Sequence, residues 1–236
     1  MSAGPEVPPA AGRAVSIVIP VRNDGAALGR LLAQLAELGA GGDVVVVDGG
    51  SADDSMDVAR RHGVAVIEAR GGRGGQLAAG CRHAPGRWLW LLHADTSDPA
   101  AALTWLRRRA AEGPDGWGRF DVAFTPASRA MALVAWSMNR RSRLTGICTG
   151  DQGMFVARPL LDAVGGVPDQ PLMEDVELSR RLKRVARPIC RPERIVTSPR
   201  RWLAHGVSRT ILRMWWYRLR YWAGASPEAL ARAYYR

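Results

Sequence analysis

Lysine is almost absent from this 236-residue sequence: Lys183 is the only lysine among 33 basic residues, and the others are arginines. Acidic residues number 22, so the formal net charge is +11 at pH 7. Such an excess favours anionic partners such as phosphates, nucleic acid or an anionic membrane surface. A codon bias toward arginine would produce the same excess. No standard nucleic-acid-binding motif is present, so we expect no nucleic-acid partner.

Cysteines and long apolar runs are also scarce. Cys81, Cys148 and Cys190 are unclustered and lack the spacing of metal ligands, which indicates a reducing cytosol without a disulfide framework. No apolar run reaches the roughly 18 residues of a membrane span. Residues 1–13 lack the apolar core of a signal peptide, and we expect a disordered leader there. We therefore predict a cytoplasmic protein.

The hydrophobic content of 47% is enough for a globular core. Apolar runs in the first half alternate with helical periods, which predicts right-handed crossovers and a mostly parallel sheet. The predicted strands are Val15–Pro20, Asp43–Asp48, Val64–Ala69 and Arg87–His93. Such sheets bind ligands beyond the carboxyl ends of their strands. The polar segments at residues 20–23, 48–51 and 93–95 would therefore line one crevice.

The second half is less regular. We expect strands at 119–124 and 153–157 and helices at 128–140, 159–164 and 174–185. The tail from Trp202 interleaves Trp and Tyr with arginine, which predicts basic aromatic helices. These helices would pack on the domain that precedes them or on a second subunit in a homodimer, or lie on a membrane surface.

Three segments of the predicted crevice have two interpretations each. Asp48 could accept a hydrogen bond from a nucleotide base, while Ser51 after it could cap a helix. Arg73 among four glycines at 71–75 could cover a diphosphate, or belong to a flexible surface loop. Asp95 could bind Mg²⁺ together with substrate phosphates, or cap the helix that follows.

Two acidic segments of the second half also have two interpretations each. Gly150, Asp151 and Gln152 precede a strand and offer polar groups to a ligand, or form a simple turn. Glu174 and Asp175 head a helix that ends in arginines, so they could complement its dipole. One of them could also be a general base.

In this order the motifs resemble family 2 glycosyltransferases, which have the GT-A fold. The segments are Ile-Pro-x-x-Asn at 19–23, Val-Asp-x-x-Ser at 47–51, the Gly/Arg loop, the Asp95 motif and Glu-Asp-x-x-Leu-x-x-Arg-Leu at 174–182. His-Ala-Asp-Thr at 93–96 and Trp-Gly-Arg-Phe-Asp at 117–121 are similar to a bacterial subgroup. Its members are labelled arsenosugar-biosynthesis or radical-SAM/selenodomain-associated glycosyltransferases.

The resemblance implies one catalytic domain over residues 14–202. Its nucleotide-sugar half would span about 14–98 and its acceptor half about 115–202, with a helical extension at 203–236. Asp175 would be the general base and Glu174 its supporting neighbour. The residues implied in donor binding are Pro20, Asn23, Asp48, Arg73, His93, Asp95, Arg201 and Trp202. Those implied in acceptor binding are Gly150, Asp151 and Gln152.

The resemblance also implies a divalent cofactor, Mn²⁺ or Mg²⁺, bound at Asp95. His93 stands where the family has a second carboxylate, and His205 is a candidate third ligand. We expect an inverting transfer from a nucleoside-diphosphate sugar, with UDP favoured, to a small-molecule acceptor. One alternative is a membrane-peripheral polyprenyl-phosphate transferase. Another is a degenerate, inactive nucleotide-binding protein.

Overall fold

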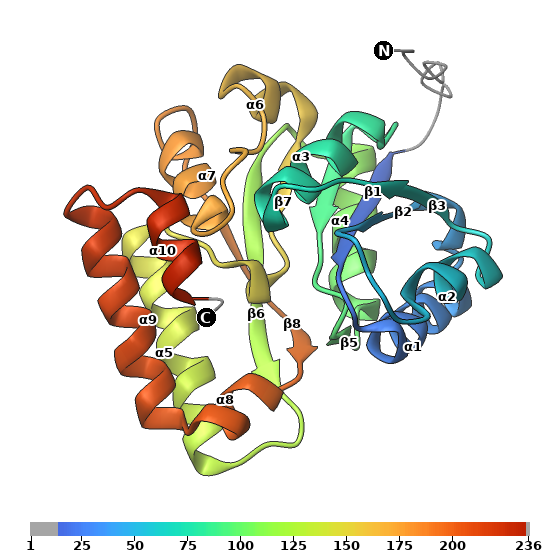
Figure 1. Ribbon diagram of the computed structural model, residues 1–236. Helices are drawn as coiled ribbons and strands as arrows, with labels where there is room; N and C mark the ends of the chain where they lie inside the picture. The colour runs from blue at the N-terminus through green and yellow to red at the C-terminus, as the bar shows by residue number, and fades with distance from the viewer. Residues whose placement is uncertain (1–13, 235–236) are drawn as a thin grey trace, which may run out of the picture.

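The computed structural model describes residues 14–234, and the expected leader at 1–13 lies outside the described residues. Within that part of the chain an α/β architecture is built on one eight-stranded sheet, in the order β3-β2-β1-β4-β7-β6-β8-β5 (Figure 1). The strands are β1 (Val15–Val21), β2 (Val44–Asp48), β3 (Ala65–Glu68), β4 (Trp88–Leu91), β5 (Thr96–Ser97), β6 (Trp117–Phe124), β7 (Phe155–Ala157) and β8 (Ile189–Thr197).

The first half of the sheet is parallel, as predicted. β1 pairs in parallel with β2 and β4, and β2 with β3. The four predicted strands are confirmed, although β4 ends at Leu91, before the polar triplet at 93–95. The helices of this half are α1 (Gly25–Glu37), α2 (Ser55–Arg61), α3 (Gly72–His83) and α4 (Ala100–Glu112), with a short 3₁₀ turn η1 (Gly41–Asp43).

The second half of the sheet is mixed. β6 pairs antiparallel with β7 and parallel with β8, and β5 pairs antiparallel with β8. β8 was not predicted, because its sequence is charged and contains Pro192. The register with β6 shifts between Phe120 and Asp121, whose partners are Arg191 and Arg194. Pro192 therefore lies in a β-bulge, where a proline costs no ladder hydrogen bond.

The remaining helices belong mostly to this half. They are α5 (Arg129–Thr145), the 3₁₀ turn η2 (Gly150–Gln152), α6 (Arg158–Ala163), α7 (Glu174–Leu182), α8 (Arg200–His205), α9 (Val207–Trp222) and α10 (Pro227–Tyr234). Figure 1 shows α5 and α9 on the side of the molecule away from β2 and β3.

Three hydrophobic clusters hold these elements together. One packs α1 and α4 on a face of the sheet, and a second packs α3, α6 and α7 on the opposite face. The third joins Val122 and Phe124 of β6 to the inner face of α5 and to Trp202, with α9 residues packed against it. Because the third cluster includes residues from α8 and α9, the C-terminal helices share the core of the second half.

The glycine run at 71–75 corrects one expectation, since it begins helix α3 and is not a flexible loop. Gly71 and Gly72 have positive φ values of 105° and 79°, a conformation that favours glycine. A Cβ on Gly74 would lie 2.3 Å from the carbonyl oxygen of Gln170. The missing side chains thus let the start of α3 contact the backbone of residues 168–171, directly before α7.

The C-terminal aromatic residues divide into two groups. Tyr217 is buried against Tyr234 of α10, and the Tyr221 hydroxyl lies 3.3 Å from Oε2 of Glu177 on α7. Tyr221 thus contacts the domain that precedes these helices, as expected, whereas Tyr217 packs against α10. The large side chains that α9 leaves exposed are Leu212, Trp215, Trp216, Leu219 and Trp222. No helix within residues 14–234 has the length and apolar character to cross a membrane.

Candidate active site

Asp48 ends β2 beside the carboxyl end of β1, where Val21 is its register partner and Pro20 precedes it. The backbone N–H groups of Gly50 and Ser51 donate to Oδ2 of Asp48 at 2.8 and 2.9 Å. Oδ1 of Asp48 is buried and has no hydrogen-bond partner among the described residues. One oxygen therefore shapes the turn, and the other is a buried acceptor that calls for a donor from a ligand.

Asn23 forms the neighbouring wall by joining two loops. Its backbone N–H donates to the Ser51 hydroxyl at 2.9 Å, and its side-chain oxygen accepts from the N–H of Ala52 at 2.7 Å. Its φ of 54° places it in the left-handed region that asparagine tolerates. Helix α2 starts at Ser55, so Ser51 is not its N-cap. Asn23 and Ser51 instead fix the loop that surrounds Asp48.

His93 and Asp95 follow β4 and meet residues from later in the chain. Nδ1 of His93 lies 3.3 Å from Oδ1 of Asp151 and 4.0 Å from Oδ1 of Asp95. The Thr197 hydroxyl of β8 lies 3.4 Å from Oδ1 of Asp95. The structure thus brings a predicted donor segment next to a predicted acceptor segment. Within residues 14–234, no three His, Cys, Asp or Glu side chains are grouped so as to hold a metal ion.

Arg73 links α3 to the head of α7. Its Nη1 lies 3.0 Å from Oε1 of Glu174, and the Glu174 side chain is only 4% exposed. A Cβ on Gly150 would lie 1.7 Å from Nη2 of Arg73, so the guanidinium lies directly against that glycine. Arg73 and Glu174 were assigned to donor and catalytic roles separately, and the fold makes them an ion pair.

Burial raises the pKa of Glu174 to about 7. The charge of Arg73 acts against this effect by lowering the pKa, and the neighbouring carboxylate of Asp175 adds to it. Glu174 therefore changes its protonation near neutral pH, which is unusual for a carboxyl group and typical of functional sites.

Asp175 is positioned by backbone groups. The N–H of Gly150 donates to its Oδ2 at 2.9 Å, and the N–H of Val176 donates to its Oδ1 at 2.8 Å. Asp175 lies in the first turn of α7, near the positive end of the helix dipole. The Asp175 side chain is partly exposed, unlike that of Glu174. It is thus the carboxylate of the pair that is open to solvent.

Gln152 supports the η2 turn from inside the protein. Its side-chain oxygen lies 3.2 Å from the N–H of Thr149, and its side-chain nitrogen donates to Ser142 and Asn139 of α5 at 3.0 and 3.2 Å. Gln152 is fully buried. Of the three residues predicted for acceptor binding, Gly150 contacts Asp175 and Arg73, and Asp151 faces His93. Gln152 instead holds the turn that carries them.

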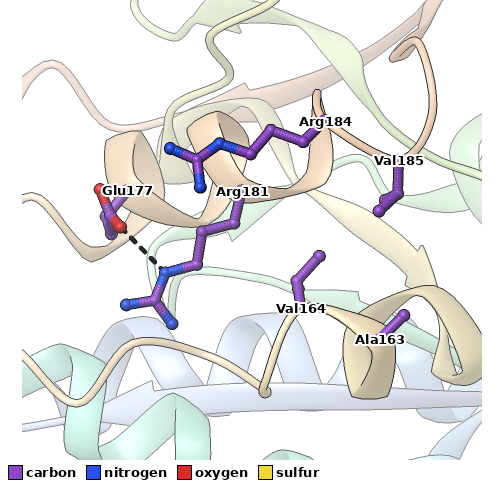
Figure 2. Close-up of a pocket in the computed structure, with 6 residues that line it drawn as sticks. All are labelled: Ala163, Val164, Glu177, Arg181, Arg184 and Val185. Carbon is purple, nitrogen blue, oxygen red and sulfur yellow. Dashed lines mark hydrogen bonds and ion pairs between the residues drawn. The ribbon is translucent and has the colours of Figure 1, made fainter.

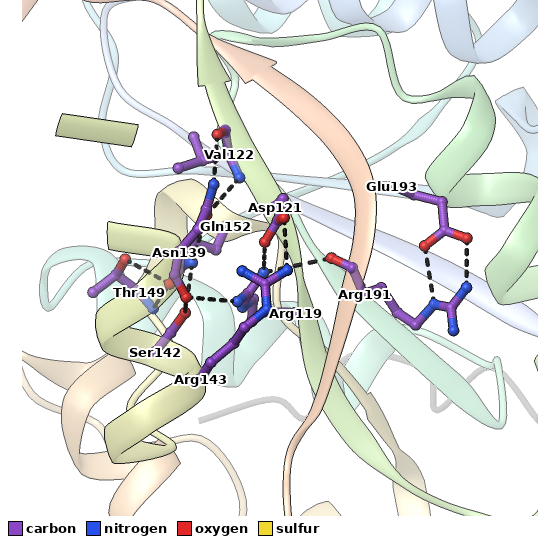
Figure 3. A network of polar contacts seen from close by, with 10 residues as sticks. All are labelled: Arg119, Asp121, Val122, Asn139, Ser142, Arg143, Thr149, Gln152, Arg191 and Glu193. Atoms are coloured by element: carbon purple, nitrogen blue, oxygen red, sulfur yellow. Dashed lines mark hydrogen bonds and ion pairs between the residues drawn. The ribbon is translucent and has the colours of Figure 1, made fainter. Parts of the chain in front are cut away.

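Figure 3 shows that this support continues into β6. Arg119 is fully buried, ion-pairs with Asp121 and donates to the carbonyl oxygen of Asn139 at 3.0 Å. Asp121 also pairs with Arg143 of α5 at 2.7 Å. The Trp-Gly-Arg-Phe-Asp segment of β6 thus anchors α5, and through Asn139 and Gln152 it anchors the turn that carries Asp151.

Helix α8 bears the last predicted donor residues. The side chains of Arg201 and His205 lie outside the part of the structure that is described. Trp202 is 8% exposed and packs edge-on against Phe124 at a ring-centroid distance of 6.0 Å. Arg200, which was not predicted, pairs with Asp24 at 2.6 Å. It thereby ties α8 to the loop that follows β1.

Two further arginines were missed by the sequence analysis. Arg141 of α5 and Arg218 of α9 are both mostly buried, and the charges of Asp151 and Asp175 act on both guanidinium groups. Each arginine follows an apolar stripe at helical spacing. That spacing was available in the sequence, but arginines are so numerous that two inward-facing ones did not stand out.

A separate surface hollow of about 340 Å³ lies between α7 and the end of α6 (Figure 2). Ala163, Val164, Arg181, Arg184 and Val185 line it together with Glu177, whose Oε1 is 2.9 Å from Nε of Arg181. None of the predicted site residues lines this hollow, so it is distinct from the crevice.

The sequence of this chain is similar to those of known transferases. Residues 16–155, more than half of the chain, match the family model described as glycosyl transferase family 2. The undecaprenyl-phosphate 4-deoxy-4-formamido-L-arabinose transferase of Klebsiella pneumoniae is 32% identical over 171 residues, which are 64% of this chain and 50% of that protein. The protein of the same name from Pseudomonas aeruginosa is 39% identical over 160 residues, 60% of this chain and 45% of that one. The chain thus spans about half the length of these curated relatives.

Solved structures share the fold. The glucosyl-3-phosphoglycerate synthase of Mycobacterium tuberculosis, in complex with Mn²⁺, UDP and phosphoglyceric acid, aligns at a TM-score of 0.59 and 21% identity over 79% of this chain and 70% of that one. A mannosyltransferase of Pyrobaculum calidifontis in complex with GDP-mannose and Mn²⁺ aligns at a TM-score of 0.55 and 22% identity, covering 79% and 57%. The architecture is therefore the GT-A fold, and this chain belongs to glycosyl transferase family 2.

Proposed function

We propose that this protein is an inverting glycosyltransferase that moves a sugar from a nucleoside-diphosphate sugar, with UDP favoured, to a small-molecule acceptor in the cytoplasm. Asp48 binds the base of the donor, Arg73 and Asp95 lie at the diphosphate, and Asp175 is the general base. Because the motifs at 93–96 and 117–121 resemble those of the arsenosugar-biosynthesis and radical-SAM/selenodomain-associated subgroup, we also propose that the protein belongs to that subgroup.

The observation that carries the proposal is the contact between Asp175 and the N–H of Gly150 at 2.9 Å. This contact puts the head of α7 against η2, whose Asp151 approaches His93 at the end of β4. A carboxylate that an acceptor can reach thus lies next to the edge of the sheet where family members and α/β proteins in general bind nucleotides.

The chemistry assigned to these residues is a single displacement. The acceptor oxygen forms a bond to the anomeric carbon while the bond from that carbon to the diphosphate oxygen breaks. The electron pair leaves with the phosphate, and Asp175 takes the acceptor proton. In this proposal Arg73 stabilises the negative charge that develops on the leaving diphosphate. Glu174 holds Arg73 through their ion pair.

A divalent cation fits this site only together with substrate. Asp95 offers one carboxylate, with the imidazole of His93 at 4.0 Å. Mg²⁺ and Mn²⁺ are commonly held by one or two carboxylates, with substrate phosphates completing the shell. A bound Mn²⁺ or Mg²⁺ would supply electrostatic stabilisation of the leaving diphosphate. We propose Asp95 as its main protein ligand, with His205 as a further candidate.

Thermal unfolding with nucleotides tests the donor site directly. The protein is heated with UDP, GDP, CDP or ADP, each with and without Mn²⁺. We expect UDP with Mn²⁺ to raise the Tm by several degrees, and the other bases to raise it less. No shift with any nucleotide would overturn the transferase proposal. Release of UDP from a UDP-sugar in the presence of Mn²⁺ would exclude the inactive, degenerate alternative.

A second candidate is a membrane-peripheral polyprenyl-phosphate transferase. It is favoured by the exposed Trp and Leu side chains of α9, which form a stripe along one face of a helix that carries no acidic residue. Amphipathic helices of this composition bind anionic membrane surfaces. The curated relatives named above act, by their names, on undecaprenyl phosphate. A second copy of the chain packed on the same face, as a homodimer, is the competing explanation of the stripe.

A further inference from the structure

The inner faces of α5 and α9 pack against each other through the third hydrophobic cluster. On α5 the inward stripe contains Met131, Val134 and Met138, and on α9 it contains Val207, Ile211 and Met214. Steps of three and four residues continue these stripes to Arg141 on α5 and Arg218 on α9. An arginine therefore occupies the next inward-facing position on each helix, where an apolar residue would otherwise extend the core.

Both arginines lie close enough to Asp175 and Asp151 for the charges of these carboxylates to act on them. On α5, Ser142 is fully buried, and it accepts a hydrogen bond from Gln152, which holds the η2 turn. On α9, Tyr221 stands one turn after Arg218 and touches Glu177, which is two residues after Asp175. In Figure 1, α5 and α9 lie away from β2, which carries Asp48.

The carboxylates near these arginines are already engaged. The two oxygens of Asp175 accept from the N–H groups of Gly150 and Val176, and Asp151 faces His93. Nε and Nη2 of Arg141 are buried and have no hydrogen-bond partner in the described part of the chain. A buried guanidinium whose N–H groups lack acceptors destabilises the fold by itself. Burial accordingly lowers the pKa of Arg141 to about 10.

We propose that Arg141 and Arg218 form an anion-binding subsite for a phosphate group on the acceptor. This inference rests on the function proposed above, because only a transferase has an acceptor to which the bound phosphate can belong. Two guanidinium groups match a phosphate monoester, because it carries about two negative charges and several acceptor oxygens. The forked N–H groups of arginine bind such oxygens in pairs. The phosphate then orients the acceptor so that a nearby hydroxyl reaches Asp175.

Calorimetric titration of the whole protein with inorganic phosphate tests this subsite. We expect wild-type protein to bind phosphate, and Arg141→Gln and Arg218→Gln each to weaken binding by about tenfold or more. Arg140→Gln and Arg220→Gln are matched controls, since these exposed arginines lie on the same two helices. The controls should bind phosphate as wild type does. No binding by wild type, or equal binding by all variants, would overturn the proposal.

Thermal unfolding of the same variants separates a binding role from a structural one. Removal of the unpartnered buried charge of Arg141 should leave the Tm unchanged or raise it. Arg218→Gln should do the same, because it removes a like charge that acts on Arg141. A fall of several degrees with unchanged phosphate affinity would show a structural role and overturn the proposal. If a glutamine variant does not fold, Arg141→Lys and Arg218→Lys replace it. The lysine variants keep the positive charge but lose the paired N–H groups of the guanidinium. We therefore expect their phosphate affinity to lie between that of wild type and that of the glutamine variants.

The donor measurement distinguishes the two proposals. If Arg141→Gln and Arg218→Gln lose phosphate but keep the Tm shift with UDP and Mn²⁺, both proposals are supported. If they lose both ligands together, the arginines serve the donor diphosphate, and the acceptor subsite is overturned. If wild type shows no UDP shift but the phosphate pattern holds, the transferase proposal fails and the anion subsite stands.

A last set of titrations identifies which kind of molecule carries the phosphate. Glycerol 3-phosphate and a short isoprenyl phosphate are titrated in parallel, with glycerol and the isoprenyl alcohol as phosphate-free controls. Tighter binding of glycerol 3-phosphate supports a small phosphorylated acceptor, and tighter binding of the isoprenyl phosphate supports a lipid phosphate. Equal binding of a phosphate compound and its alcohol would overturn the proposal, because the phosphate would then contribute nothing.

Discussion

Nη1 of Arg73 lies 3.0 Å from Oε1 of Glu174, and the two residues are about a hundred positions apart in the chain. The glycines at the start of α3 make this pairing possible, because they let the backbone of residues 168–171 approach the helix. The pair connects the nucleotide side of the crevice to the helix that carries Asp175.

The first prediction concerns the pH dependence of stability. Burial raises the pKa of Glu174 to about 7 in the folded protein, from 4.5 in the unfolded chain. The folded state therefore binds the proton more tightly, and this contribution to stability is fully present below about pH 4.5 and is lost as the pH rises through about 7. We expect the free energy of unfolding to fall by up to a few kcal/mol over that window through this group.

Urea unfolding at several pH values, compared between wild type and Glu174→Gln, isolates this contribution. Glutamine keeps the shape of the side chain but does not ionise, so its stability relative to wild type should increase as the pH rises from 4.5 to 7. Parallel curves for the two proteins across the window would contradict the raised pKa.

The second prediction concerns the general base. Asp175→Asn keeps one oxygen for the N–H of Gly150 but turns an NH₂ donor toward the N–H of Val176. The fold should be kept, and the Tm should fall by only a few degrees. Transfer should fall by a factor of about 10²–10⁴, the usual contribution of a general base. The UDP-dependent Tm shift serves as the control for donor binding and should persist. Transfer within a few-fold of wild type would show that another group accepts the proton.

The third prediction concerns Asp48. Asp48→Asn can keep the turn through its side-chain oxygen, but it replaces the buried, unpartnered Oδ1 with an NH₂ donor. A nucleotide base that donates an N–H there would meet a second donor, so UDP affinity should fall by about tenfold or more. Asp57→Asn is a control on the surface of α2. Equal UDP affinity in the two variants would remove Asp48 from the donor site.

The fourth prediction tests the packing role of the glycines at the start of α3. Alanine normally stabilises a helix relative to glycine by up to about 1 kcal/mol. In Gly74→Ala the new Cβ would lie 2.3 Å from the carbonyl oxygen of Gln170, which is backbone and cannot rotate away. We expect a loss of more than about 1 kcal/mol in the free energy of unfolding, measured with urea.

Gly29→Ala on α1 is the matched control for this change. Its Cβ would meet only Cγ1 of Val58 at 3.3 Å, a side-chain atom that can shift. The control should change stability by no more than about 1 kcal/mol in either direction. A stabilised Gly74→Ala protein would show that residues 168–171 do not pack on the start of α3.

The fifth prediction concerns the exposed stripe of α9. If the second candidate function holds, wild-type protein sediments with vesicles that contain 30% anionic phospholipid, and it does so more weakly as salt increases. The double variant Trp215→Ser, Trp216→Ser should remain in the supernatant. Val185→Ser, an exposed apolar residue outside α9, is the control. A concentration-dependent dimer without vesicle binding would assign the stripe to a second copy of the chain.

The parallel half of the sheet and the crevice could be predicted from sequence because their signals are local. β1, β2 and β4 are short apolar runs that are rich in β-branched or aromatic residues and end in polar residues, which is typical of buried strands. Asp48 was found in this way, at the end of an apolar run. Helix α3 and strand β8 were not found. The glycines that start α3 disfavour a helix locally and are retained for a tertiary contact, and β8 tolerates Pro192 only because its partner strand accommodates a bulge.

The sequence by itself determined the fold class, the order of the motifs and the identity of the acidic pair at 174–175, since periodicity and residue type are properties of short segments. Only the tertiary structure decided that Arg73 pairs with Glu174 and that Gln152 supports its turn from within. It also decided that Arg141 and Arg218 both lie near the carboxylates of Asp151 and Asp175. The partners of a buried charge come from distant segments. Its pKa and its need for a ligand therefore depend on how the helices pack, which no local pattern records.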